Sequence, residues 1–213
     1  MPRIGLIHAL RHSPGPIAEA FARLWPEAVL ANLLDDSLSA DLAAAGKLDD
    51  AMTERFLTLG RYVRRCGADA ILFTCSAFGP CIEAVAADLA PVPVLKPNEA
   101  MIGEALGLGR RIGLLATFAP TLASMPPEFA AADASVSVVP KLAEGALAAL
   151  DAGDGATHDR LAAEAARGLA DCDAIALAQF SLARAAPAVA AATGRPVLTT
   201  PDSAVRKLRM LLR

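Results

Sequence analysis

An internal repeat constrains the fold of this 213-residue chain more than any other feature of its sequence. Residues 68–87, ADAILFTCSAFGPCIEAVAA, align without a gap with residues 172–191, CDAIALAQFSLARAAPAVAA. Shorter blocks match in the same order: RIGLI at 3–7 with RIGLL at 111–115, PVL at 93–95 with PVL at 196–198, and PNEA at 97–100 with PDSA at 201–204. The repeat therefore predicts two similar halves, which we expect to be related by a pseudo-two-fold axis.

Short apolar runs alternate with longer alanine-rich segments in both halves. The runs are bounded by Pro, Gly or Asp and lack polar alternation, which is typical of parallel strands buried on both faces. We predict strands at 4–10, 27–34, 70–75, 91–95, 111–117, 135–140, 174–179 and 195–200. We predict helices near 16–25, 49–67, 79–89, 141–150, 157–170 and 181–193. This alternation predicts an α/β fold of two Rossmann-like halves, each with a parallel sheet.

The repeat also predicts where the halves meet along the chain. We place the first half at 1–97 and the second at 98–200. The last segment, PDSAVRKLRMLLR, matches the helix expected to open at Pro97, so about 201–213 should cross back onto the first half. Two crossings would leave a cleft between the halves, and small ligands usually bind in such clefts.

The composition argues against several classes of protein. A net charge of −3 without a basic block does not suit a nucleic-acid surface. No apolar run reaches the roughly 18 residues of a membrane span, and MPRIGLIHAL is too short for a signal peptide core. We therefore expect a cytoplasmic protein with reduced thiols. The four cysteines form no C-x-x-C pair and histidines number three, so structural zinc is not expected.

The repeat places Cys75 opposite Gln179, each at the end of a predicted strand and before a predicted helix. Ligand-binding groups gather at the carboxyl ends of parallel strands. Backbone N–H groups and the helix dipole should lower the pKa of a thiol there, which predicts a reactive Cys75 thiolate. Thr74 and Ser76 supply hydroxyls beside it, and Ser181 supplies one in the second half. The alternative is that Cys75 only packs as a small apolar side chain, as we expect for Cys81.

A second acid or base is most plausible at His8, near the end of the first predicted strand. Imidazole is suited to proton transfer near neutral pH, although His8 can equally be a structural residue in a turn. His12 follows in a loop and is expected to reach the same region. Asp36 and Ser37 follow the second strand, where they can orient His8, bind substrate or merely cap a helix.

Further candidates lie at other predicted helix starts. Thr117 and Thr121 stand in a strand-to-helix turn, where hydroxyls and amides suit a carboxylate, although threonine is also a common cap. Glu99 opens a helix, where it can contact substrate or complement the helix dipole. Three phenylalanines in turns form either an apolar wall of the cleft or core: Phe78, Phe118 and Phe180.

These segments resemble the aspartate/glutamate/hydantoin racemase superfamily over nearly the whole chain. ILFTCSAFGP (71–80) is the most specific motif, supported by the glutamate of PNEA, RIGLLATFAPT (111–121) and AIALAQFSLARAAP (174–187). The resemblance implies an enzyme without metal or pyridoxal cofactor, acting on a small carboxylate or amino-acid-like substrate, and possible homo-oligomers. In that family two cysteines, one per half, exchange protons with opposite faces of the substrate's α-carbon. It implies that residues at these turns hold the substrate carboxylate: Thr74, Ser76, Ala77, Thr117, Gln179, Phe180 and Ser181.

The chain departs from this pattern at the second cysteine position, which holds Gln179. An amide does not exchange protons near neutral pH, and Cys172 precedes its strand, at the opposite end of the predicted sheet. Two-thiol racemisation is therefore not expected. We expect a racemase- or isomerase-type enzyme that uses Cys75 as acid, base or nucleophile, with His8 as the candidate partner.

Several alternatives remain open. One is a single-cysteine lyase, similar to the arylmalonate decarboxylase branch, although that branch keeps its cysteine in the second half. Another is a covalent cis–trans isomerase similar to the maleate isomerase branch, which carries two cysteines. The chain can also be an inactive protein that binds small carboxylates, or an unrelated hydrolase that uses Cys75, although no Cys-His-Asn set is apparent in the sequence.

Overall fold

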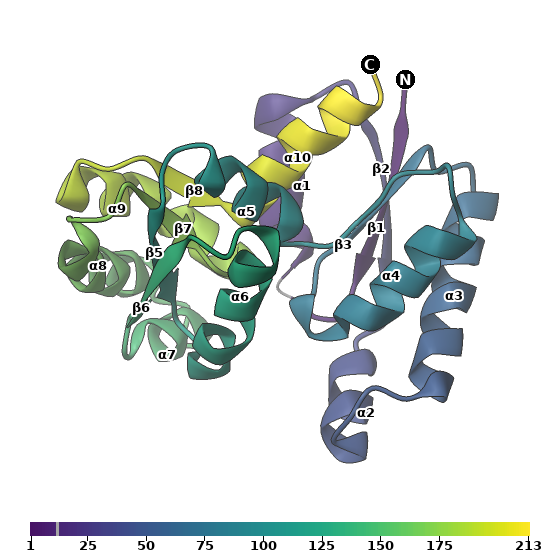
Figure 1. Ribbon diagram of the computed structural model, residues 1–213. Coiled ribbons are helices and arrows are strands. Elements are labelled where there is room, and N and C mark those ends of the chain that lie inside the picture. Colours follow the sequence, from purple (N-terminus) through teal and green to yellow (C-terminus); the bar gives the residue numbers. More distant parts are fainter. Residues whose placement is uncertain (12) are drawn as a thin grey trace. The chain divides into compact units, whose positions relative to one another are not determined.

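The computed structural model describes residues 1–11 and 13–213. Contacts divide them into unit 1, Met1–Pro97 with Ala204–Arg213, and unit 2, Asn98–Ser203. Each unit contains one four-stranded parallel sheet flanked by helices (Figure 1). The predicted α/β fold with two parallel sheets is confirmed.

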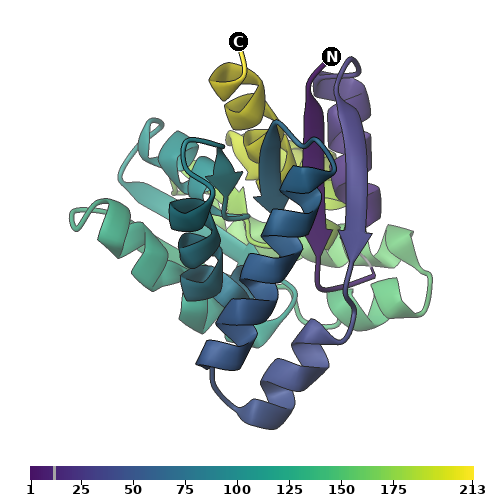
Figure 2. The ribbon, with the colours of Figure 1, turned by 90° about the vertical axis from the view of Figure 1, so that its right-hand side faces the viewer.

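Unit 1 is built on sheet A, whose strand order is β2-β1-β3-β4. Its strands are β1 (Arg3–His8), β2 (Val29–Leu34), β3 (Ala70–Phe73) and β4 (Val94–Leu95). Its helices are α1 (Pro14–Leu24), α2 (Leu38–Ala45), α3 (Asp50–Arg65), α4 (Gly79–Asp88) and most of α10 (Thr200–Leu211), with the 3₁₀ turn η1 (Ser76–Phe78) before α4. Figure 2 shows β1 and β2 running side by side in the same direction.

Unit 2 repeats this topology in sheet B, whose order is β6-β5-β7-β8. Its strands are β5 (Arg111–Ala116), β6 (Ser137–Leu142), β7 (Ala174–Leu177) and β8 (Val197–Thr199). Its helices are α5 (Glu99–Leu106), α6 (Ala119–Ala132), α7 (Ala146–Asp151), α8 (Gly155–Ala166) and α9 (Ala186–Thr193), with 3₁₀ turns η2 (Arg167–Leu169) and η3 (Phe180–Ala185). Even the registers correspond, since Ile7 faces Phe73 and Leu115 faces Leu177.

The central strands are buried because helices cover both faces of each sheet. Every residue of β3 and of β7 is buried, as the continuous apolar runs predict. In unit 1, Phe56 of α3 stacks on Phe73 at 5.3 Å and contacts Phe78 at 4.8 Å between ring centroids. These rings pack under the carboxyl end of β3, so the turn that follows this strand rests on a rigid aromatic cluster.

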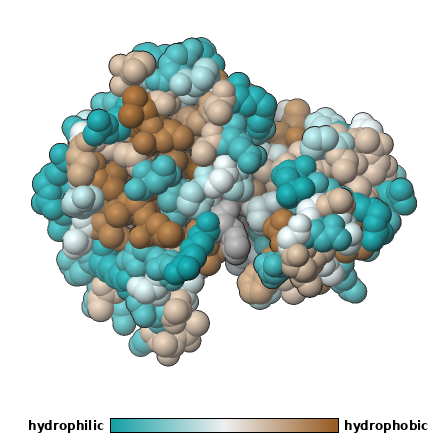
Figure 3. All heavy atoms as spheres, turned by 180° about the vertical axis from the view of Figure 1, so that it is seen from behind, coloured by the Kyte–Doolittle hydropathy of each residue, from teal (hydrophilic) through white to brown (hydrophobic). Residues whose placement is uncertain are grey.

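The surface of unit 1 also carries apolar side chains. Leu10, Val29 and Leu34 are among its exposed large hydrophobic residues. Hydrophobic residues gather on the face of this unit seen in Figure 3. No helix in residues 1–11 and 13–213 is long and apolar enough to cross a membrane.

Two helices lie outside the predicted helical segments, and one predicted helix starts later than expected. The first two are α2, which is short, and α6, which contains Pro126 and Pro127 and whose start was expected only as a strand-to-helix turn at Thr117 and Thr121. The helix predicted at 141–150 begins only at Ala146, since β6 continues through Leu142. The central strands also end earlier than predicted, which leaves the residues after them free to form turns.

Candidate active site

Cys75 and Gln179 occupy equivalent positions in their own units. Each follows a central strand by two residues, after Phe73 and Leu177, and each directly precedes a 3₁₀ turn. Their backbones are both extended, with φ −127° and ψ 124° at Cys75 and φ −139° and ψ 147° at Gln179. The carboxyl end of sheet A therefore presents a thiol where sheet B presents an amide.

Cys75 is half-buried and packs against the core cluster of unit 1. It borders a small, mostly apolar recess that has no room for a water molecule. The recess is lined by Ile7, His8, Ala9, Leu38, Phe56, Phe73, Cys75 and Phe78. The thiol thus stands at the apolar edge of the core, partly exposed to solvent.

This environment corrects the predicted depression of the Cys75 pKa. Burial raises the pKa of the thiol, and a hydrogen bond from the Ala77 backbone N–H lowers it by less. The turn η1 has only three residues, so it supplies little of the helix dipole on which the prediction relied. Near neutral pH, Cys75 is consequently a protonated thiol, suited to donate a proton rather than to attack as a thiolate.

His8 is buried and fully hydrogen-bonded. Its Nδ1 lies 2.9 Å from Thr74 Oγ1, and its Nε2 lies 2.9 Å from Asn32 Oδ1. Because the Asn32 oxygen can only accept, Nε2 carries the hydrogen, and in the neutral ring Nδ1 accepts from the Thr74 hydroxyl, whose longer alternative acceptor is Ile7 O at 3.4 Å. Burial lowers the pKa of His8, and the bond to Asn32 offsets this only in part. His8 is therefore a neutral imidazole of fixed tautomer.

Strand alternation directs the side chains of His8 and Thr74 away from the face of sheet A that carries Cys75, although His8 also borders the recess beside the thiol. Ile7, Phe73 and Cys75 belong to one core cluster, and side chains alternate between the faces of a strand. The Thr74 N–H still bonds Ile7 O at 3.0 Å, so the alternation continues to this residue. In this arrangement His8 is better placed to hold Thr74 in position than to exchange a proton with the Cys75 thiol.

The residue that orients His8 is Asn32, and the prediction of Asp36 or Ser37 for this role is wrong. Asp36 accepts from Arg11 Nε at 2.6 Å, and the Ser37 hydroxyl donates to Asp35 at 2.8 Å. Sequence reasoning missed Asn32, although it is the one polar residue in the strand VLANLL, and that was a usable signal.

In unit 2, the Gln179 amide is tied to Thr117. The Gln179 Oε1 atom accepts from the Thr117 N–H at 2.7 Å and from the Thr117 hydroxyl at 3.0 Å. The two donors that we expected to bind a substrate carboxylate are thus engaged by the protein's own amide oxygen. Within the described chain, the Gln179 amide nitrogen has no hydrogen-bond partner.

The hydrogen-bonded chain Thr74–His8–Asn32 of unit 1, which runs from two buried side chains to the exposed Asn32, is absent from unit 2. In the aligned registers, Ala116 stands for His8, Ala178 for Thr74 and Pro140 for Asn32. None of these three side chains can form a hydrogen bond. The duplicated backbone therefore carries different chemistry in each unit.

The remaining candidates are spread over both units. Ser76 and Ala77 are exposed in η1, Ser181 is half-buried in η3, and Phe180 is nearly buried. Glu99 is exposed at the first residue of α5 and already has an interaction partner. His12 lies outside the described residues.

The last four candidates lie in the core or at the start of a helix. Phe78 is core, whereas Phe118 is 49% exposed before α6. Thr121 lies in the first turn of α6, where its N–H bonds Phe118 O. Cys81 is buried in the core, as predicted.

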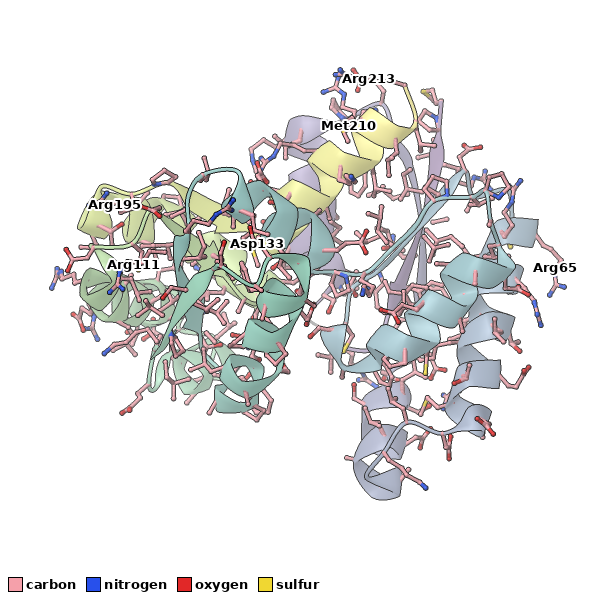
Figure 4. The ribbon with its side chains drawn as sticks, viewed as in Figure 1. Arg65, Arg111, Asp133, Arg195, Met210 and Arg213 are labelled. Atoms are coloured by element: carbon pink, nitrogen blue, oxygen red, sulfur yellow. The ribbon has the colours of Figure 1, made fainter. Side chains whose placement is uncertain are left out.

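Cys172 lies at the amino end of sheet B, as the sequence predicted, and the structure shows that it is buried there. It precedes β7 and lies within the electrostatic reach of Arg111, at the start of β5, and Arg195, before β8 (Figure 4). It is therefore at the end of the sheet opposite to Gln179. Among the residues that the structure describes, no His, Cys, Asp and Glu side chains cluster as metal ligands.

The two parallel sheets share one strand order and one register, and helices flank each of them. This arrangement defines an α/β protein of two similar units. The chain belongs to the Asp/Glu/Hydantoin racemase family, whose profile matches residues 17–208. No curated protein matches the chain significantly.

Solved structures of this fold cover almost the whole chain. Allantoin racemase from Klebsiella pneumoniae superposes with a TM-score of 0.75 and 19% identity, over 100% of this chain and 88% of that one. Glutamate racemase from Bacillus anthracis superposes with a TM-score of 0.72 and 14% identity, over 99% of this chain and 81% of that one. An arylmalonate decarboxylase superposes with a TM-score of 0.67 and 21% identity, over 99% of this chain and 92% of that one. At these identities the likeness shows the fold.

Proposed function

We propose that this chain is a cofactor-independent enzyme that acts at the carbon next to the carboxylate of a small acid, with Cys75 as the proton-transferring group. The observation that carries the proposal is the pair of equivalent positions, one holding a thiol and the other an amide. The family pattern has a proton-transferring thiol at each of these positions. The protonated state of Cys75 supports its use as an acid.

A reaction that needs one proton delivered to one face fits this arrangement best. Racemisation requires a second acid or base, and the Gln179 amide cannot serve as one. His8 is a poor substitute because both of its ring nitrogens are engaged by Asn32 and Thr74. An enzyme with one thiol is therefore better suited to act as a lyase than as a racemase.

The favoured reaction is decarboxylation of a malonate-type diacid. The bond between the α-carbon and one carboxylate breaks, carbon dioxide leaves, and the electron pair remains as an enediolate. The Cys75 S–H then protonates the α-carbon, and water returns a proton to the thiolate. No oxidant or reductant is needed, and the proton always arrives from the side of Cys75.

The proposal is tested with phenylmalonate and 2-methyl-2-phenylmalonate, by following release of carbon dioxide from both and the chirality of the 2-phenylpropanoate formed from the second. Single enantiomers of aspartate and glutamate in D₂O test racemisation alongside. We expect turnover of a malonate that falls by about 100-fold or more in Cys75→Ser.

Cys66→Ser is the matched control, because Cys66 is an exposed thiol after α3 and should be dispensable. Full turnover in Cys75→Ser would refute the assignment of Cys75. Binding of a malonate without turnover, unchanged in Cys75→Ala, would instead establish a carboxylate-binding protein.

A further inference from the structure

We propose that β2 is a dimerisation strand, which pairs antiparallel with the β2 strand of a second copy of this chain. It is the outermost strand of sheet A, and within residues 1–11 and 13–213 its only paired strand is β1 (Figure 2). The pairing would join two four-stranded sheets into one continuous sheet across the dimer. This interface lies in unit 1 and does not depend on the proposed reaction.

The free edge of β2 offers unpaired backbone groups. The N–H groups of Val29 and Asp35 bond to carbonyl oxygens of the first segment of the chain, at 2.9 and 3.0 Å. Alternate residues therefore direct their N–H and C=O groups toward β1 or away from it. The residues that direct both groups away from β1 are Leu30, Asn32 and Leu34. Within the described chain these outward groups have no backbone partner.

The side chains of β2 suit contact with another chain better than exposure to water. The strand reads VLANLL, without a charged residue or a proline. Val29 is 36% exposed and Leu34 is 43% exposed, in a unit whose rear face is rich in hydrophobic residues (Figure 3). Edge strands of monomeric proteins usually carry lysine, proline or a bulge, which prevents pairing with another chain. The strand β2 carries neither lysine nor proline, and its register with β1 continues without a bulge.

The repeat-related edge strand β6 is blocked at the matching position. It is the outer strand of sheet B and reads SVVPKL. In the aligned registers, Pro140 stands where β2 has Asn32, and Lys141 follows it. The Ser137 N–H bonds to Arg110 O, so Pro140 is an outward residue, and it has no N–H to offer. One outer edge of this duplicated protein is thus closed to strand pairing, whereas the other is open.

This contrast also indicates which strand is the partner. The outer strands at the other edges of the two sheets are short, since β4 has two residues and β8 has three. With β6 blocked by its proline, the full-length partner strand that the described chain offers is β2 itself. A strand that pairs with its own copy forms an isologous interface around a two-fold axis.

One register uses every outward group of β2. In an antiparallel pair, opposite residues whose backbone groups point at each other exchange two N–H···O bonds. A two-fold axis at Asn32 places Leu30 opposite Leu34 of the second copy, which gives about six such bonds. An axis at Ala31 would instead place Leu34 opposite Ala28, whose N–H is already bonded within its own chain. The axis is therefore expected at Asn32.

The side chains that this register brings together are compatible. Leucine meets leucine on one face of the joined sheet, and Ala31 meets Leu33 of the second copy on the other. Like charges do not face each other along the strand, because β2 has no charged residue. Just beyond the strand, Asp35 lies opposite Val29 of the second copy, and its carboxylate is already paired with Arg55 at 2.5 Å.

Sedimentation velocity of the full-length protein, between about 1 and 100 μM, measures the monomer–dimer equilibrium. We expect the wild type to be a dimer at the upper end of this range. Leu34→Lys introduces a charge of the kind that protects natural edges, and Leu34→Pro removes an outward N–H without removing a bond to β1. Each change occurs twice in the dimer, so each should raise the Kd for dimerisation at least about tenfold.

Leu142→Lys on β6 is the matched control. Leu142 faces Ala116 as Leu34 faces His8, and its strand is already blocked by Pro140. This variant should dimerise like the wild type, and circular dichroism shows whether all variants are folded. A wild type that is monomeric throughout the range would overturn the proposal, as would a dimer whose Kd both Leu34 variants leave unchanged.

Disulfide cross-linking tests the register directly. Ala31→Cys and Leu33→Cys are made in a Cys66→Ser background, which removes an exposed native thiol, and are oxidised separately and as a mixture. The two positions face each other with Cα atoms about 4.5 Å apart, so the linked dimer should form mainly in the mixture. Peptide mass spectrometry locates the bond. Linkage of Ala31→Cys to itself would refute the axis at Asn32, and no linkage in any sample would refute the strand pairing.

Discussion

Among single residues, Cys75 shows how burial can outweigh position. It stands at the end of a parallel strand, where backbone N–H groups are available, and Ala77 does donate to its sulfur. Yet the surrounding apolar side chains disfavour the thiolate more than this bond favours it. The residue is therefore better described as an acid than as a nucleophile.

Alkylation with iodoacetamide tests this description, with the exposed Cys66 as the internal reference. Because burial raises its pKa, Cys75 should be alkylated more slowly near neutral pH, and its rate should rise only above the range of an ordinary thiol, about 8.5. Peptide mass spectrometry resolves the two sites. A Cys75 rate that rises at lower pH than that of Cys66 would restore the thiolate prediction.

His8 makes a contribution to stability that depends on pH. Its pKa in the unfolded chain is about 6.5 and its pKa in the folded protein is lower. Below pH 6.5 the unfolded state therefore binds more protons, so the free energy of unfolding falls as the pH drops from 6.5 toward the folded pKa.

We expect His8→Gln to lose less stability than the wild type between pH 7.5 and pH 5, since its side chain does not titrate. Urea unfolding at both pH values measures this difference. Equal losses in the two proteins would show that the His8 pKa is not lowered by folding.

At the scale of elements, the two units differ in how closely helices approach the first strand of each sheet. Gly5 of β1 and Gly113 of β5 are repeat-related. A Cβ at Gly5 would lie 2.1 Å from Val63 Cγ1 of α3, whereas a Cβ at Gly113 would lie 3.1 Å from the nearest Leu169 side-chain atoms. Helix α3 thus packs on β1 through a contact that only glycine allows.

Substituting each glycine by alanine measures this contact. Gly5→Ala should lower the free energy of unfolding by about 1–3 kcal/mol, because Val63 and α3 must shift. Gly113→Ala should cost less, because flexible Leu169 atoms can move by the few tenths of an ångström required. Urea denaturation of both variants gives the comparison, and a reversed order would contradict the packing described here.

The elements also show what a sequence can reveal. Periodicity and the repeat predicted both sheets, because buried parallel strands are continuous apolar runs. They did not reveal α6, whose two internal prolines look like breakers. The bonds from Thr117 to Gln179 and from His8 to Asn32 were not predictable, since each depends on strand register between residues far apart in sequence. The pKa of Cys75 depends on burial, which its position alone does not reveal.

Across the whole molecule, duplication preserves the backbone and changes the chemistry. The strand order, register and turn positions are the same in both units. The side chains at equivalent strand ends differ. Unit 1 has a thiol and the hydrogen-bonded residues Thr74, His8 and Asn32, whereas unit 2 has an amide held by Thr117. A one-sided proton transfer is the expected result of this asymmetry.

Restoring the symmetry should restore a second proton-transferring group. In Gln179→Cys, a thiol replaces the amide in the same extended backbone position, and the Thr117 N–H becomes available to it. Incubated in D₂O with one enantiomer of 2-phenylpropanoate, the variant should racemise it at least about tenfold faster than the wild type.

Gln179→Ser is the control, because its hydroxyl is too weak an acid or base to replace the thiol. Chiral chromatography with mass detection reports both racemisation and deuterium uptake. Comparable racemisation by the wild type would mean that a second acid or base already acts there, and the one-thiol proposal would fall.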